Sequence, residues 1–208
     1  MAWDAPGCGA SSDPPESYRL PEYADALAAL VDAIGLEPVH LVGHSWGTGL
    51  ALELYRRRPE LVTAMVLAGA YAGWAGSLPR EEVEARLQLA LRAEPASMPG
   101  LVSDAIPADR AEELARIMSE ARPSTMRTMA YAFAEADLRA VLADIAVPVL
   151  ILAGDADERS PLSVARAIHA SIRDSHLVEL PGLGHEMFFE DSVTCDDAVR
   201  AFLRVVAQ

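Results

Sequence analysis

Cysteine is scarce in this chain, which has only two, Cys8 and Cys195, among 208 residues. The two show neither the spacing of a metal-binding motif nor the number that a disulfide framework needs. Because disulfides are typical of oxidising compartments, this cysteine usage favours a reducing one, and we predict a cytoplasmic location. Cys8 is a formal candidate for a nucleophile, but no histidine accompanies it in a recognisable pattern.

Long hydrophobic runs are missing as well, although hydrophobic residues make up 51% of the chain. No segment approaches the roughly 20 apolar residues of a membrane-spanning helix. Residues 1–6 contain neither the basic region nor the apolar run of a secretory signal. We therefore predict no membrane partner, and a chain of this length can bury a sizeable core without disulfides.

Basic residues are few relative to acidic ones. The chain has 17 basic and 31 acidic residues and a formal net charge of −14. Such a charge disfavours binding to phosphate backbones, so we expect no nucleic-acid partner. The one basic run, residues 56–58, stands at a predicted helix end before Pro59, where basic residues are common. The sequence also lacks zinc-ligand clusters, a P-loop and the G-x-G-x-x-G fingerprint, so no metal and no cofactor are predicted.

Strand-like and helix-like segments alternate along most of the chain. This alternation is typical of an α/β fold, with a mostly parallel sheet and flanking helices. A helical pattern covers residues 21–34 and ends at Gly35. Short apolar, β-branched segments predict strands, of which the first reads as buried, at residues 38–42, 62–68, 148–154 and 177–180.

The alternation breaks in the middle of the chain, where only helix-like runs occur, at residues 81–93, 109–121 and 124–135. We predict a core of residues 1–72 and 145–208 with a helical cap, residues 73–144, inserted into it. A cap over the strand ends would form a pocket and exclude water. Its apolar residues either line that pocket or hold the cap together: Trp74, Leu78, Leu87, Leu91, Met98, Met118, Met126, Met129, Tyr131 and Phe133.

Residues 43–47 read Gly-His-Ser-Trp-Gly, a G-x-S-x-G pattern with Ser45 at its centre. A predicted strand precedes the pattern and a helix-like run, residues 48–55, follows it. Strand, turn and helix together form a nucleophile elbow, in which the serine is strained and exposed and the glycines relieve crowding. The helix N-terminus favours negative charge that develops there. Ser45 is therefore the candidate nucleophile.

A serine nucleophile needs a base, and the chain has five histidines. We favour His185, because it lies in a loop directly after a predicted strand, where open α/β sheets build their sites. His40 falls within a predicted buried strand and is interpreted as structural. His44 is next to the serine in sequence, so its side chain is expected to point away. His169 and His176 fall in a predicted helix and at the start of a predicted strand.

The acid that orients the base is expected between the serine and the histidine. The predicted strand at residues 148–154 leads into a loop with three acidic residues, Asp155, Asp157 and Glu158. We favour Asp157, at the fourth position of a G-x-x-D turn that a proline closes before a helix. Asp155 is closer to the strand end and remains a competitor, whereas Glu158 is expected to be solvated.

These motifs resemble those of the α/β-hydrolase superfamily, in particular its cap-bearing serine esterase, lipase, lactonase and cofactor-free haloperoxidase-like branch. The order serine, aspartate, histidine is that of α/β-hydrolases and not of trypsin-like or subtilisin-like proteases. A serine at the elbow, instead of an aspartate, separates the chain from dehalogenase and epoxide-hydrolase relatives. The resemblance runs from end to end of the chain, through residues 4–12, 43–47, 154–161 and 184–185.

The resemblance implies that Ser45 is the nucleophile, Asp157 the acid and His185 the general base, with the backbone N–H of Trp46 as an oxyanion donor. It also implies several strands and a second oxyanion loop before Asp4, where this sequence has three residues. We therefore expect a fragment or a misplaced start that cuts through a strand, and an unpaired edge on the strand before the serine. Loss of one oxyanion donor lowers rates about a hundredfold to a thousandfold.

The predicted activity is hydrolysis of a carboxylic ester, or a related acyl bond, of a small hydrophobic substrate through an acyl-enzyme. Tyr71 and Trp74 follow a predicted strand end and have the best positional claim to bind that substrate. Hydrolysis of a C–C bond, a lactone or an amide by the same residues is an alternative, because one scaffold hosts many chemistries. A truncated, non-catalytic relative is another.

Overall fold

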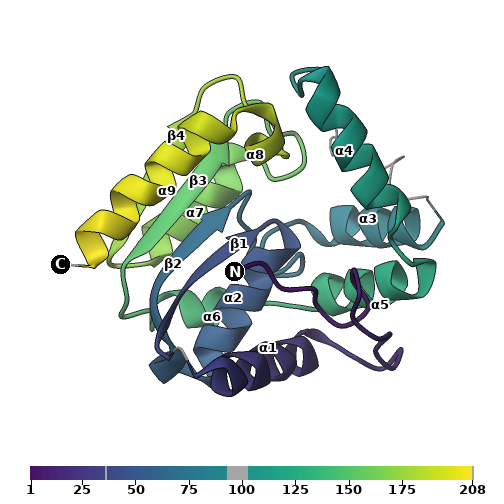
Figure 1. Ribbon diagram of the computed structural model, residues 1–208, viewed down its shortest axis with the longest axis horizontal. Coiled ribbons are helices and arrows are strands. Elements are labelled where there is room, and N and C mark those ends of the chain that lie inside the picture. Colours follow the sequence, from purple (N-terminus) through teal and green to yellow (C-terminus); the bar gives the residue numbers. More distant parts are fainter. Residues whose placement is uncertain (36, 93–102, 208) are drawn as a thin grey trace.

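The computed structural model describes residues 1–35, 37–92 and 103–207. A sheet of parallel strands forms its centre (Figure 1). This architecture confirms the predicted α/β fold with a parallel sheet and flanking helices. The strands follow one another in space as they do in sequence: β1 (Val39–His44), β2 (Val62–Ala68), β3 (Val149–Gly154) and β4 (Ser175–Leu180).

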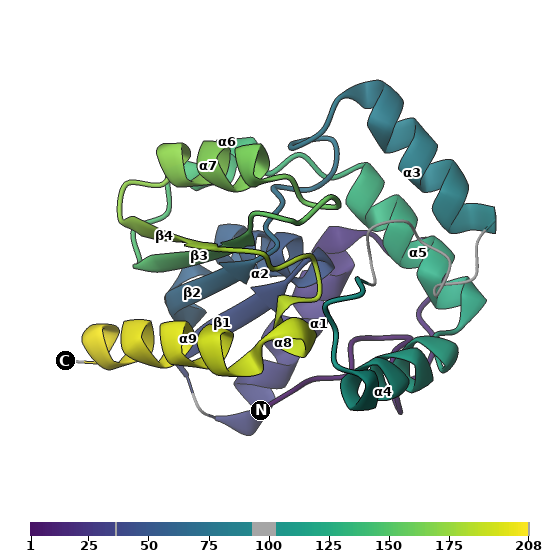
Figure 2. The ribbon, with the colours of Figure 1, turned by 90° about the horizontal axis from the view of Figure 1, so that it is seen from above.

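Helices cover both faces of the sheet (Figure 2). Alternate side chains of a strand point to opposite faces, so Met65 and Leu67 of β2 join one hydrophobic cluster and Val66 joins the other. The first cluster also holds residues of α1 (Leu20–Ile34), α2 (Trp46–Arg57), α6 (Arg139–Leu142) and α7 (Leu162–Ser171). The second holds residues of α8 (Met187–Glu190) and α9 (Ser192–Val206).

Three further helices lie between β2 and β3 in sequence, and they sit together at one end of the sheet (Figures 1 and 2). The described part of residues 73–144 contains no strand. The helices begin and end within about two residues of the predicted runs. Residue 93, the predicted end of the first run, and Met98, one of the predicted apolar cap residues, lie outside the described residues. The division into core and cap stays a prediction. These helices are α3 (Arg80–Arg92), α4 (Ala108–Ser119) and α5 (Pro123–Ala134).

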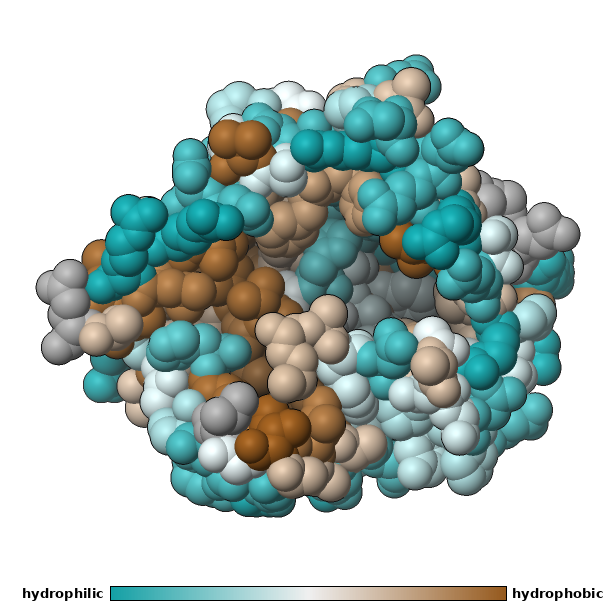
Figure 3. All heavy atoms as spheres, in the orientation of Figure 1, coloured by the Kyte–Doolittle hydropathy of each residue, from teal (hydrophilic) through white to brown (hydrophobic). Residues whose placement is uncertain are grey.

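The prediction that the strand before the elbow is buried is wrong, whereas the unpaired edge that the resemblance implies is confirmed among the described residues. Among the described residues β1 pairs only with β2, so it forms an edge of the sheet, and Val42 is 55% exposed. His40 is exposed too, and its Nδ1 lies 2.9 Å from Thr63 Oγ1. On the face in Figure 3, hydrophobic side chains gather over the strands between α9 and the N-terminal segment. A groove lined in part by Trp3, Leu27 and Val42 runs along this edge.

The parallel register brings the carboxyl ends of the strands to one edge of the sheet. His44 pairs with Ala68 across β1 and β2, and Gly154 pairs with Leu180 across β3 and β4. The segments that leave these ends therefore meet. A Cβ on Gly154 would lie 2.0 Å from the carbonyl oxygen of Leu183, so only glycine lets the loop after β4 pass so close to β3.

No helix in residues 1–35, 37–92 or 103–207 combines the length and the apolar character that crossing a bilayer requires.

Candidate active site

The turn between β1 and α2 holds Ser45 in a strained backbone conformation. Its φ of 52° and ψ of −115° make it the single non-glycine residue with positive φ in the described chain. Such a conformation costs on the order of 1–3 kcal/mol and persists only where its surroundings impose it. One contact that holds this conformation is a hydrogen bond of 2.9 Å from the Ser45 N–H to the carbonyl oxygen of Ala68, at the end of β2.

The two glycines of the turn differ in what they allow. A Cβ on Gly43 would lie 2.4 Å from the carbonyl oxygen of Gly47, a backbone atom that cannot move away without reshaping the turn. A Cβ on Gly47 would meet nothing within 4 Å. The expectation that both glycines relieve crowding is therefore right for Gly43 and wrong for Gly47, whose Cβ would point into open space.

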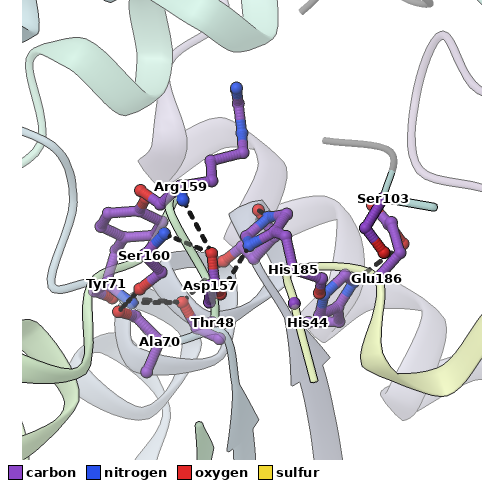
Figure 4. Close-up of polar contacts among 12 residues, drawn as sticks. His44, Thr48, Ala70, Tyr71, Ser103, Asp157, Arg159, Ser160, His185 and Glu186 are labelled. Carbon is purple, nitrogen blue, oxygen red and sulfur yellow. Dashed lines mark hydrogen bonds and ion pairs between the residues drawn. The ribbon is translucent and has the colours of Figure 1, made fainter. Parts of the chain in front are cut away.

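A chain of hydrogen bonds joins the three predicted catalytic side chains. His185 Nε2 lies 2.8 Å from Ser45 Oγ, and His185 Nδ1 lies 2.9 Å from Asp157 Oδ2. The side chains of His185 and Asp157 are almost wholly buried, at 0% and 1% exposure. Figure 4 shows the imidazole facing the carboxylate across the strand ends. Burial shields this relay from water, which strengthens its electrostatic interactions.

Backbone N–H groups orient the carboxylate that faces the imidazole. Asp157 Oδ1 accepts hydrogen bonds from the N–H of Arg159, at 2.8 Å, and of Ser160, at 2.7 Å. With Oδ1 held in this way, Oδ2 is directed at His185. Its competitor Asp155 is exposed and accepts a hydrogen bond from the N–H of Gly182, at 2.6 Å. The fold thus brings Asp157, and not Asp155, to the imidazole.

Two side chains that the sequence reasoning left aside hold the segment around His185. His44 Nε2 donates a hydrogen bond of 2.8 Å to the carbonyl oxygen of His185, and burial lowers the pKa of the His44 imidazole. Glu190 Oε2 accepts a hydrogen bond of 2.6 Å from the N–H of Gly184, and its Oε1 accepts one from Ser103 Oγ. The His44 side chain does turn away from the Ser45 nucleophile, as expected, toward the backbone of the base.

A cavity of about 160 Å³ opens beside Ser45. The indole of Trp46 forms part of its wall and donates a hydrogen bond of 3.1 Å to the carbonyl oxygen of Met129 in α5. The backbone N–H of Trp46 stands at the first residue of α2, where an N–H has no partner within the helix. The helices α3 and α5 contribute the apolar side chains Ala90, Met126, Met129, Ala130 and Phe133.

The two predicted substrate-binding residues have different places. Trp74 lines the cavity, whereas Tyr71 is not among the described residues that line it. Tyr71 is buried and donates a hydrogen bond to the carbonyl oxygen of Arg159, next to which it lies in Figure 4. Its hydroxyl also accepts a hydrogen bond of 2.9 Å from Arg86 Nη1. Burial raises the pKa of its hydroxyl. Its place is therefore behind the loop that carries Asp157.

Arg159 is the charged residue that the sequence reasoning missed among the described residues of the cavity wall. The sequence does contain a signal for Arg159, because it is a basic residue in a loop that follows a strand end, two positions after Asp157. The direction of its side chain cannot be predicted from the sequence, because it depends on the loop conformation. Glu190 and Arg86 carry no comparable signal: Arg86 lies in α3 among many charged residues, and Glu190 ends the short helix α8 and does not directly follow a strand.

One group of potential metal ligands occurs among the described residues. His44, His185 and Glu186 place donor atoms within 4.8 Å of one another. Both ring nitrogens of His185 already face other partners, Ser45 and Asp157. This arrangement suits proton transfer better than a metal cage, because a metal on His185 Nε2 would displace the hydroxyl. The absence of a metal therefore stays a prediction.

Comparison with known proteins places the fold among hydrolases. A family model described as "Alpha/beta hydrolase family" matches residues 1–201. Over 213 residues the chain is 28% identical to a putative carbamate hydrolase, RutD, of Klebsiella pneumoniae subsp. pneumoniae, covering 96% of this chain and 79% of that protein.

Solved structures agree with this relationship. A hydrolase from Pseudomonas aeruginosa PA01 superposes with a TM-score of 0.81 and 28% identity, over 96% of this chain and 77% of that one. An esterase from Exiguobacterium antarcticum has a TM-score of 0.82 and 23% identity, over 98% and 80%. A bromoperoxidase from Bacillus anthracis has a TM-score of 0.84 and 23% identity, over 96% and 79%. At these identities the last two show the shared fold only.

Proposed function

The chain belongs to the alpha/beta hydrolase family, and from that premise we propose that it is a serine hydrolase. The proposed reaction is cleavage of a carboxylic ester, or a related acyl bond, of a small substrate. The observation that carries the proposal is the buried chain of hydrogen bonds from Ser45 through His185 to Asp157. A hydroxyl, an imidazole and a carboxylate in this order are the groups that make a serine nucleophilic.

The reaction begins when Ser45 Oγ attacks the substrate carbonyl and passes its proton to His185 Nε2. At 2.8 Å the two atoms are within hydrogen-bond reach, as general-base catalysis requires. Asp157 accepts a hydrogen bond from Nδ1, which fixes the tautomer with a free Nε2 lone pair and stabilises the imidazolium that forms. The collapse of the tetrahedral intermediate then takes the proton from Nε2 to the departing alcohol and leaves an acyl-enzyme.

The negative charge on the carbonyl oxygen needs hydrogen-bond donors during both halves of the reaction. The N–H of Trp46 is the proposed donor, and the N-terminus of α2 adds a favourable dipole at the same place. In the second half, His185 takes a proton from water as the water attacks the acyl carbon. The acid product leaves, and Ser45 regains its proton from His185.

The cavity supports short, mostly apolar acyl groups. At about 160 Å³ it is small beside the roughly 300–1,000 Å³ of sites for drug-sized ligands. Its walls include Trp46, Trp74 and Phe133, aromatic side chains that bury apolar surface of a ligand. A helical cap, with α3 and α5 over Ser45, would exclude water from the acyl-enzyme until hydrolysis.

Other bonds are cleaved by the same sequence of proton transfers. The Klebsiella relative is a putative carbamate hydrolase, and a carbamate presents a carbonyl that forms the same kind of tetrahedral intermediate. Lactones, amides and the C–C bonds of diketones stay as alternatives to a simple ester. A non-catalytic relative that only binds ligands is the alternative outside hydrolysis.

The first test is covalent labelling with a fluorophosphonate probe, followed by intact-mass measurement and peptide mapping. The expected result is one adduct per chain on Ser45, because the probe reports a hydroxyl activated by its base. Ser45→Ala and His185→Ala are expected to remove the adduct. Ser171→Ala, at an exposed serine of α7, is the matched control and should be labelled like the unaltered protein.

An unlabelled but folded protein would contradict the proposal and favour the non-catalytic alternative. Circular dichroism on the same samples establishes folding. Hydrolysis of 4-nitrophenyl butyrate by the protein and by the Ser45→Ala variant then separates ester cleavage from labelling. If both hydrolyse this ester at the same rate, the assignment of Ser45 is wrong.

A further inference from the structure

The peptide unit between Arg159 and Ser160 supplies one of the hydrogen bonds that orient the Asp157 carboxylate. Its N–H, that of Ser160, donates to Asp157 Oδ1 at 2.7 Å. Its carbonyl oxygen, that of Arg159, faces the other way, because a trans peptide is planar and its N–H and C=O point in opposite directions. Groups that hold the carbonyl therefore also aim the N–H. Figure 4 shows the carboxylate between Ser160 and the imidazole of His185.

Two side chains hold the carbonyl oxygen of Arg159. The hydroxyl of Tyr71, in the segment after β2, donates one hydrogen bond, and Arg86 Nη2, in α3, donates another of 2.8 Å. A carbonyl oxygen has two lone pairs, so these donors use both. Arg86 Nη1 also donates to the Tyr71 hydroxyl at 2.9 Å. Each of the three groups is therefore bonded to the other two, which fixes the carbonyl in one direction.

Both donors are themselves held in place. Tyr71 is 1% exposed, and its N–H donates to Thr48 Oγ1 at 3.0 Å. Burial raises the pKa of its hydroxyl, so the hydroxyl stays protonated and able to donate near neutral pH. The Arg86 side chain is 15% exposed and pairs with Glu82 Oε1 at 2.5 Å, one turn earlier in α3. This ion pair compensates the charge of a mostly buried guanidinium.

Building on the proposed hydrolase function, we propose that Tyr71 and Arg86 are positioning residues, which aim the Asp157 carboxylate at the base through the 159–160 peptide. Neither is among the described residues that line the cavity beside Ser45, so they act on the reaction through the carboxylate and not through the substrate. A rotation of the peptide would withdraw the N–H of Ser160 from Oδ1 and release the carboxylate from its orientation. The helix α3 thereby helps to align the acid, in addition to lining the cavity.

The first test is Tyr71→Phe, which keeps the ring and removes the hydroxyl alone. Its kcat for 4-nitrophenyl butyrate is expected to fall about threefold to tenfold, as for loss of a hydrogen bond. KM should stay unchanged, because the cavity wall is unaltered and both halves of the reaction use the same base.

Tyr55→Phe is the matched control. Tyr55 is a buried tyrosine of α2 whose hydroxyl accepts a hydrogen bond of 2.9 Å from the N–H of Ala146, at the opposite end of β3 from Asp157. Its kcat should stay unchanged. An equal fall in both variants would show a loss of stability only and overturn the inference. An unchanged kcat, or a rise in KM alone, in Tyr71→Phe would overturn it as well.

Proton NMR separates this inference from the hydrolase proposal, because it needs no reaction. The Nδ1 proton of His185 is buried and bonded to Asp157, so it is expected to give a resonance far downfield that disappears in His185→Ala. Tyr71→Phe should move this resonance, since the carboxylate shifts relative to the imidazole, and Tyr55→Phe should leave it in place. The result counts even if the fluorophosphonate probe leaves Ser45 unlabelled. An unmoved resonance in Tyr71→Phe would overturn the inference.

Arg86→Met tests the contribution of α3 and provides a second variant if Tyr71→Phe does not fold. It keeps a long apolar side chain, and it should lower kcat and move the resonance in the same directions as Tyr71→Phe. Arg80→Met is its control, because it loses a comparable ion pair, with Glu84, at the start of α3. An effect no larger than that of Arg80→Met would overturn the role proposed for Arg86.

Discussion

Asp155 and Asp157 stand two positions apart in one loop, yet their carboxylates have different partners. Asp157 faces His185, whereas Asp155 is exposed and accepts from the N–H of Gly182. If Asp157 orients the base, Asp157→Asn should lower kcat for ester hydrolysis by about 10⁴-fold, because the amide favours the wrong imidazole tautomer. Asp155→Asn, the matched change, should leave kcat close to that of the unaltered protein.

The measurement is kcat with an activated ester for the two variants, with urea unfolding to show that each is folded. The reverse order of effects would assign the acid to Asp155. Equal and small effects would mean that neither carboxylate takes part in the reaction.

At the scale of single residues, sequence reasoning reached the side chains whose position follows from a strand end. Ser45, Asp157 and His185 each lie just after a strand, and parallel strands bring such residues together. It missed Arg159 and Glu190, because their contributions depend on where a long side chain points. It put Tyr71 in the substrate site by its place after β2, but its ring lies behind the loop of Asp157.

At the scale of the elements, the turn from β1 into α2 contains two glycines that differ in the space available for a side chain. Gly43→Ala places a Cβ against the backbone of Gly47 and should lower the free energy of unfolding by about 1–3 kcal/mol, the usual cost of overpacking. Gly47→Ala meets open space inside a helix and should change it by no more than about 1 kcal/mol, in the stabilising direction.

Urea unfolding of both variants measures these differences, and labelling of Ser45 shows whether the turn keeps its shape. Equal stabilities would mean that the turn relaxes around an added methyl group. A large loss in Gly47→Ala would contradict the open surroundings of that position.

The strands and helices themselves were predictable because their signals are local. Apolar β-branched runs and helical spacing placed β2, β3, α4 and α5 within about two residues of their observed bounds. The exposure of β1 was not predictable from the same signal, since a run such as residues 38–42 reads alike at a sheet centre and at an edge. In the structure β1 pairs with a single described neighbour, and Val42 is 55% exposed.

One link between elements joins the proposed cap to the loop of the acid. Arg86 of α3 donates to the carbonyl oxygen of Arg159, whose own N–H holds Asp157. A movement of α3 would therefore change the position of the Asp157 carboxylate through one intervening residue, Arg159. Tyr71, in the segment after β2, forms a hydrogen bond with each of the two arginines and so supports this link from the core side.

For the molecule as a whole, His44 makes stability depend on pH. Burial lowers the pKa of His44 in the folded state below its unfolded value of about 6.5. The unfolded chain then binds a proton first, so the free energy of unfolding falls as the pH drops through about 6.5 toward the folded pKa. For one histidine the slope is at most about 1.4 kcal/mol per pH unit.

His44→Gln should flatten this dependence, because glutamine does not titrate and its amide can still donate to the carbonyl oxygen of His185. Urea unfolding between about pH 5.5 and 8 measures the slope, a range that spans the unfolded histidine pKa. His176→Gln, at an exposed histidine of β4, controls for the loss of an imidazole. The same slope in His44→Gln as in the unaltered protein would contradict the role given to His44.

The net charge of −14 and the edge strand act in opposite directions on the whole molecule. An unpaired strand edge with exposed apolar side chains invites pairing with another chain. A large charge of one sign keeps copies apart, and salt screens it. The balance between them is a property of the whole surface and cannot be read from β1 alone.

The hydrogen-bond chain at Ser45 joins residues 140 and 28 positions apart in the sequence. Such a meeting exists only while the segments after β1, β3 and β4 are all in place. If Ser45 reacts with a fluorophosphonate as proposed, the fraction of chains labelled in a brief pulse counts the molecules that are native at that moment. The nucleophile thereby becomes a stoichiometric reporter of the folding equilibrium, readable by mass at any temperature or denaturant concentration.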